Sequence, residues 1–112
     1  MERFEIKNRA DTDKYIDGLS GKKQRVALQD YSIAFELARY GKTIIYRDTQ
    51  NKEIGLEDLG LSELMEEVDL GGAVDWKVAE AYPEILNSRE RVFVASFNAL
   101  LDRKDLQTKF LR

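Results

Sequence analysis

The spacing of hydrophobic residues along the chain predicts a protein built mostly of helices. Two stretches, 22–40 and 89–104, place apolar residues three and four positions apart, which is typical of helices with one buried face. We expect helices at Arg9–Asp17, 22–40 and 89–104. In the first, Tyr15 and Ile16 should be buried. In the second, one side should be formed mainly by Val26, Tyr31, Ile33, Ala34, Leu37 and Ala38. The third has the broadest apolar face and should lie at the centre of the core. Its expected buried residues are Val92, Phe93, Phe97, Leu100 and Leu101.

Polar residues at the expected helix starts support this interpretation, because their side chains can accept a hydrogen bond from a first-turn backbone N–H. We expect four such caps: Asn8 before Arg9–Asp17, Ser62 before a helix at 63–68, Asp75 before a helix through about Tyr82, and Ser88 before 89–104. Pro83, the only proline, should interrupt or restart a helix.

Shorter segments have the alternation or the β-branched composition of strands. Residues 43–46 are a good strand, turn-forming residues follow at 48–51, and 53–56 is a weaker returning strand. Residues 1–8 alternate, and residues 1–7 could pair with 43–46. The predicted fold class is therefore helix-rich α+β, with four or five helices packed with a small two- or three-stranded antiparallel sheet or hairpin.

Length and composition indicate one soluble domain. A chain of 112 residues is close to the commonest domain size, so we expect 1–112 to form a single compact unit. With 43% hydrophobic and 35% charged residues it has the balance of a globular protein. No apolar run is long enough for a membrane span, and the N-terminus has no apolar signal segment. We therefore expect a cytoplasmic protein that does not contact a membrane.

The chain contains neither cysteine nor histidine, and this excludes several classes of chemistry. Cysteine nucleophiles, histidine-based catalytic triads and histidine- or cysteine-bound zinc sites cannot be built. The acidic positions do not follow the calcium-loop pattern, and no glycine-rich phosphate loop is present. We expect no cofactor and no metal site, and we expect a protein that is not an enzyme.

Charge is strongly segregated along the sequence. Residues 53–76 contain eight acidic residues and no basic residue, whereas the segments on either side are mildly basic. One interpretation is a solvated surface whose charge is balanced across the fold by Lys22, Lys23 and Arg25. The other is a negative patch that binds a basic partner, which would steer association and weaken with salt. The candidate patch residues are Glu57, Asp58, Glu63, Glu66, Glu67 and Asp69.

Apolar residues near this segment and at the C-terminus are candidate anchors for a partner. Trp76 is either a core residue or an exposed interface anchor, and Phe110 and Leu111 raise the same question for the tail. If the tail does not pack on its own core, it could dock on a second copy of the chain or on another protein.

The first functional hypothesis is a small acidic protein-interaction module. Such a protein would be an adaptor, an assembly chaperone or an inhibitor, for instance from a phage or other mobile element, and it would bind another protein or itself. A second hypothesis is a nucleic-acid-associated accessory protein that contacts phosphates through Lys22, Lys23 and Arg25. A third is an enzyme that works through carboxylates or a divalent metal ion held by Glu63, Glu66 and Glu67.

Overall fold

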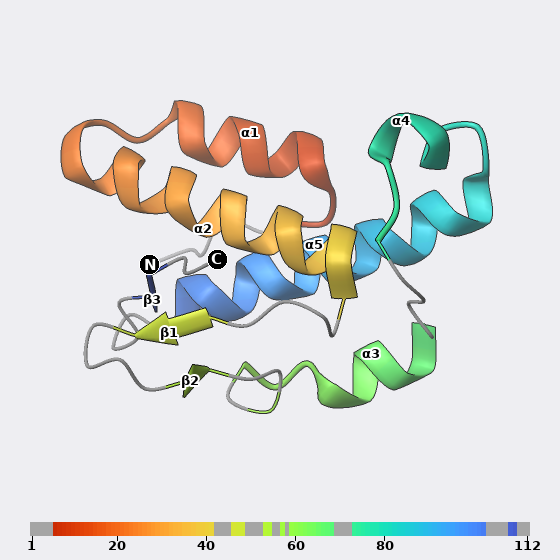
Figure 1. Cartoon of the computed structure of the whole chain (residues 1–112). Coiled ribbons are helices and arrows are strands. Elements are labelled where there is room, and N and C mark those ends of the chain that lie inside the picture. Colours follow the sequence, from red (N-terminus) through yellow and green to blue (C-terminus); the bar gives the residue numbers. More distant parts are fainter. Residues whose placement is uncertain are drawn as a thin grey trace.

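Two 20-residue helices, α2 (Gly21–Tyr40) and α5 (Pro83–Asp102), pack against each other and form the centre of the protein (Figure 1). Helix α1 (Arg9–Asp17) packs on both, and α3 (Ser62–Val68) and α4 (Trp76–Ala79) pack on α5. The computed structural model describes residues 6–41, 46–48, 53–54, 57, 59–68, 73–102 and 108–109.

The first helix begins as the sequence predicts. The Asn8 side chain accepts a hydrogen bond from the backbone N–H of Asp11 at 2.9 Å, and the Asp11 carboxylate accepts one from the backbone N–H of Lys7 at 2.9 Å. These two bonds satisfy donors that the helix itself leaves free. After α1, Gly21 has φ 59° and allows the sharp turn into α2, whose end at Gly41 (φ 64°) is also as expected.

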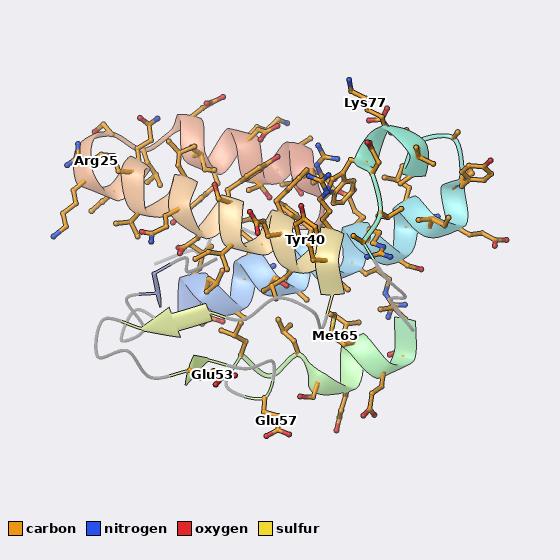
Figure 2. All side chains as sticks on the ribbon, viewed as in Figure 1. Arg25, Tyr40, Glu53, Glu57, Met65 and Lys77 are labelled. Carbon is orange, nitrogen blue, oxygen red and sulfur yellow. The ribbon has the colours of Figure 1, made fainter. Side chains whose placement is uncertain are left out.

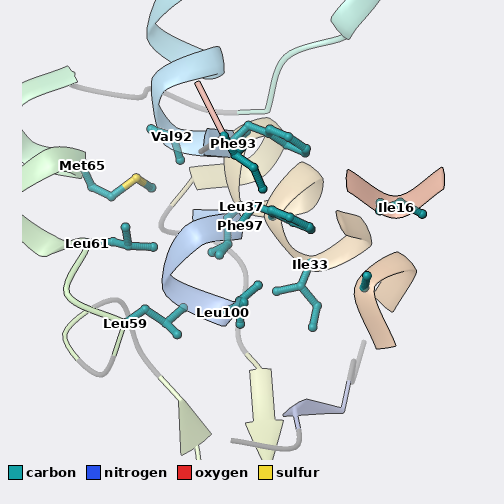
Figure 3. Close-up of a cluster of buried hydrophobic side chains, with 14 of the residues drawn as sticks. Ile16, Ile33, Leu37, Leu59, Leu61, Met65, Val92, Phe93, Phe97 and Leu100 are labelled. Carbon is teal, nitrogen blue, oxygen red and sulfur yellow. The ribbon is translucent and has the colours of Figure 1, made fainter. Parts of the chain in front are cut away.

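The core forms where the apolar faces of α2 and α5 meet (Figure 3). Phe93 and Phe97 are fully buried, and their rings lie with centroids 6.3 Å apart. Val92 and Leu100 are buried as predicted, whereas Leu101 is half-buried. Helix α3 adds Met65 to the same core.

Three expectations for the first two helices differ in detail. Val26 was expected inside but is 46% exposed, because the neighbouring Ala27 occupies the buried position of that turn. Tyr15 and Tyr31 are half-buried, with their rings edge-on to Phe97 and Phe93 respectively. The core therefore has a rim of tyrosines whose hydroxyl ends can stay near solvent.

Helix α5 begins six residues before the predicted position. Pro83 occupies its first position, where a missing backbone N–H costs nothing and the fixed φ suits a helix. Ser88 is therefore an interior residue of α5, and its prediction as a cap is wrong. Helix α4 has its predicted cap, since the Asp75 carboxylate accepts a hydrogen bond from the backbone N–H of Lys77 at 2.7 Å, but α4 ends at Ala79.

The prediction of an α+β fold is wrong, because the protein is helical. In the part of the chain that the structure describes, five helices form the core, and strand pairing involves only a few peripheral residues. The strands β1 (Tyr46–Asp48), β2 (Glu53–Ile54) and β3 (Thr108–Lys109) pair antiparallel in the order β2-β1-β3. Segments of two and three residues are too short to form a layer with its own buried face.

The predicted strand and tail positions can be compared with the structure only where their residues are described. Of the predicted hairpin between 43–46 and 53–56, the structure describes Tyr46 opposite Ile54 and the neighbouring pair Arg47–Glu53. Residues 43–45 and 55–56 lie outside the described residues, and Asp48, predicted in the turn, belongs to β1. The second neighbour of β1 is β3 from the C-terminal segment, in the position expected for residues 1–7. Residues 1–5, 103–107 and 110–112 lie outside the described residues. Within the described helices, none is both long and apolar enough to cross a membrane.

Candidate functional site

The acidic segment presents its helical carboxylates to solvent. In α3, Met65 is buried against the core and the preceding Leu61 is buried four residues earlier, so these two define the inner face. Glu63, Glu66 and Glu67 of the predicted patch lie on the other faces of α3 and are exposed. Glu57, in the turn before the helix, is also exposed. Asp58 and Asp69 lie outside the described residues.

The basic start of α2 does not balance this charge. Lys22, Lys23 and Arg25 are exposed, and Arg25 lies at the opposite end of the molecule from α3 (Figure 2). Among the described residues, the ion pair formed by the acidic segment joins Glu67 to Arg91 of α5 at 3.1 Å. Both side chains are more than half exposed, so this pair screens one carboxylate weakly.

Exposed apolar side chains lie next to further carboxylates where α4 leads into α5. Val78, Tyr82 and Ile85 are 53%, 57% and 39% exposed, and Glu80 and Glu84 between them are exposed as well. Figure 1 shows α3, α4 and the start of α5 at the same end of the protein. We call this region, from Ser62 to Val68 and over residues 77–85, the acidic end.

Trp76 is a core residue, so its interpretation as an exposed anchor is wrong. It is only 8% exposed, and its indole stacks on Phe35 of α2 with ring centroids 4.9 Å apart and an interplanar angle of 29°. Its position directly after the Asp75 cap turns the side chain inward from α4. Phe110 and Leu111 lie outside the described residues.

A second feature surrounds this tryptophan. The guanidinium of Arg9 lies over the Trp76 ring, 4.8 Å from its centroid, and 5.8 Å from the centroid of Phe35. Arg39 lies one helical turn after Phe35, and its backbone oxygen accepts a hydrogen bond from the N–H of Val74, two residues before Trp76. Its guanidinium lies over the ring of Tyr40, 5.1 Å from the centroid. We call Arg9, Phe35, Arg39 and Trp76 the arginine–aromatic cluster.

Arg89 lies beside this cluster and closes the end of α2. Its Nη1 donates to the backbone oxygen of Ala38 at 2.9 Å and to that of Arg39 at 3.1 Å. The backbone oxygen of Arg39 also accepts a hydrogen bond from the backbone N–H of Val74 at 3.1 Å. The carbonyl end of a helix favours a positive charge. Burial lowers the pKa of Arg89 from its usual value, because the surroundings disfavour the charged form.

Sequence reasoning identified none of these arginines. Arg89 could have been found, because it precedes Val92 and Phe93 by three and four residues and so shares the buried face of α5. Arg9 and Arg39 have no comparable signal, since their proximity to Trp76 depends on how α1, α2 and α4 pack.

The described residues provide no group of three or more carboxylates placed to hold a metal ion. Glu63, Glu66 and Glu67 of α3 therefore do not converge. One other carboxylate stands out by its environment: burial raises the pKa of Asp30, on α2, to about 6. No protein-family model, curated protein or solved structure matches this chain.

Proposed function

We propose that the protein is a non-enzymatic binding module whose acidic end docks on a basic, partly apolar surface of another protein. The supporting observation is that Val78, Tyr82 and Ile85 are exposed within one short stretch that also exposes Glu80 and Glu84. Exposed apolar groups bordered by charge are typical of interaction sites. Val78, Tyr82 and Ile85 take the anchor role first considered for Trp76.

The two kinds of side chain have different roles in such a contact. A tyrosine that leaves water on binding contributes contact area and a hydroxyl group at little entropic cost, so Tyr82 is the main anchor. The carboxylates of α3 raise the rate of encounter with a basic surface and select against acidic partners. Helix α5 belongs to the core, so the anchors at its start are held on a rigid support.

The charge distribution favours a different protein over a second copy as the partner. In a symmetric dimer through this surface, the acidic end of one copy would face the acidic end of the other, because a two-fold interface pairs the same patch with itself. Like charges brought together in this way oppose association. We therefore expect a monomer by light scattering at low and at high salt.

The test is affinity capture from cells that carry the gene, with two charge-reversal variants compared side by side. Glu63→Lys with Glu66→Lys alters α3, and Asp13→Lys with Asp17→Lys alters α1. All four residues are exposed, and both variants change the net charge by the same amount. Circular dichroism and thermal melting establish that each variant keeps the fold.

The proposal predicts at least one protein that is captured by wild type and by the α1 variant but is lost with the α3 variant. Equal capture profiles for the two variants would contradict it. If the captured material is instead nucleic acid that disappears when Lys22, Lys23 and Arg25 are changed to glutamine, the nucleic-acid hypothesis replaces it.

A further inference from the structure

We propose that the arginine–aromatic cluster binds an oxyanion, a phosphate or carboxylate group, and that this site is independent of the acidic end. The cluster lies where the start of α1, the end of α2, α4 and the first half of α5 meet (Figure 1). All of its free hydrogen-bonding groups are donors, which is the chemistry that an oxyanion requires.

Within the part of the chain that the structure describes, three buried donors of this cluster have no hydrogen-bond partner. They are Nε of Arg9, Nε of Arg39 and Nε1 of Trp76. Buried polar groups in native proteins are almost always paired, so an unpaired group needs an explanation. Among the described residues the only other such atom is the hydroxyl of Ser96, so unpaired donors concentrate at this junction.

Among the described residues, neither arginine side chain has a carboxylate partner. Glu90 is the acidic residue that reaches Arg9, but its Oε1 accepts from the backbone N–H of Arg9 at 2.8 Å. The Arg9 guanidinium instead lies on the Trp76 and Phe35 rings, and that of Arg39 lies over the Tyr40 ring at 5.1 Å. Arginines held on aromatic faces keep their N–H groups available for an anion.

The site is accessible from solvent through the arginines themselves. Arg9 and Arg39 are half-buried, so part of each residue reaches the surface while its Nε is covered. An anion would meet the guanidinium groups first, and the indole N–H of Trp76 would complete its hydrogen bonds after a small adjustment of the arginine side chains. Two positive charges without carboxylate partners provide the electrostatic attraction.

The chain has a single tryptophan, so the site has its own spectroscopic reporter. In ¹⁵N–¹H correlation spectra, the one indole N–H peak belongs to Trp76, and the arginine Nε–H peaks include those of Arg9 and Arg39, which Arg9→Gln and Arg39→Gln assign by their disappearance. We would titrate wild-type protein with inorganic phosphate, with acetate and with chloride at constant ionic strength. Whichever of phosphate and acetate binds with the higher affinity identifies the class of anion.

The proposal predicts a saturable shift of the Trp76 indole peak with phosphate or acetate and none with chloride. Arg39→Gln should weaken the affinity about tenfold or more, because it removes a charged donor, whereas Arg25→Gln at the far end should leave it unchanged. Arg39→Lys, which retains charge but not the guanidinium fork, should bind with intermediate affinity.

No saturable shift with either oxyanion, or a shift that chloride reproduces, would overturn the proposal and indicate that ordinary water satisfies these donors. Equal affinity of wild type and Arg39→Gln would also overturn it. The wild-type titration decides the question by itself if Arg39→Gln does not fold.

Discussion

Replacing Arg89 with methionine tests how the two central helices are held together. Methionine replaces the aliphatic part of the arginine side chain but lacks the guanidinium, so it removes the hydrogen bonds from Nη1 to the backbone oxygens of Ala38 and Arg39. A hydrogen bond to a charged group contributes about 1.5–3 kcal/mol, and the Arg39 oxygen would keep its bond from Val74. Burial disfavours the charged form of Arg89 and lowers its pKa. Removing this charge therefore offsets part of the stability that is lost with the hydrogen bonds.

The expected net loss for Arg89→Met is therefore about 2 kcal/mol. With an unfolding entropy of about 2.1 cal/mol/K per residue, this lowers Tm by about 8 °C for 112 residues. Urea unfolding followed by circular dichroism measures it directly.

The matched control for this change is Arg91→Met, two positions along the same helix, which removes an exposed ion pair with Glu67 and should cost less than about 1 kcal/mol. If Arg89→Met destabilises the protein no more than Arg91→Met does, the bonds from Arg89 to the end of α2 contribute nothing and our interpretation is wrong.

Three other substitutions test separate parts of the structure. Phe97→Ala should cost about 3–5 kcal/mol in urea unfolding, because its fully buried ring leaves a cavity between α2 and α5, whereas Leu28→Ala, at a 48% exposed position, should cost far less. Burial raises the pKa of Asp30 to about 6. The contribution of Asp30 to the stability of the folded state is therefore greatest below about pH 4 and is lost as pH rises through 6. Asp30→Asn should therefore raise Tm at pH 7.5 but not at pH 4, and an equal effect at both values would contradict the raised pKa. Asn8→Ala should cost about 1 kcal/mol because Asn8 caps α1, whereas Ser88→Ala inside α5 should be neutral or slightly stabilising, and the reverse order would restore the cap predicted from sequence.

The helices were predictable because their signals are local. Asn8 needs only the Asp11 N–H three residues away to start α1, and Gly41 needs only a positive φ to end α2. Amphipathic spacing then identified the buried Phe93 and Phe97 without knowledge of their partners. The start of α5 was missed because both Pro83 and Ser88 are plausible first-turn residues, and local signals do not choose between them.

The class of the fold was wrong because strand formation depends on partners that are distant in sequence. The β-branched segment at 43–46 predicts a strand well, but a sheet layer requires long neighbouring strands, and β2 and β3 are only two residues each. The candidate site was incomplete for the same reason. Exposed carboxylates on α3 follow from the sequence, whereas the exposure of Tyr82 and the meeting of Arg9 with Trp76 follow from packing.

The most direct test of the proposed function is the kinetics of binding to the partner captured in the charge-reversal experiment. We would measure association and dissociation rate constants at about 50 and 300 mM NaCl for wild type, for Glu63→Lys with Glu66→Lys, and for Tyr82→Ser. Because exposed charges act mainly on encounter and desolvated anchors mainly on lifetime, the charge variant should associate more slowly and lose its salt dependence. The Tyr82 variant should dissociate faster at an unchanged association rate. An association rate that is insensitive to salt and to the charge reversal, or a dissociation rate that Tyr82→Ser leaves unchanged, would contradict binding through the acidic end.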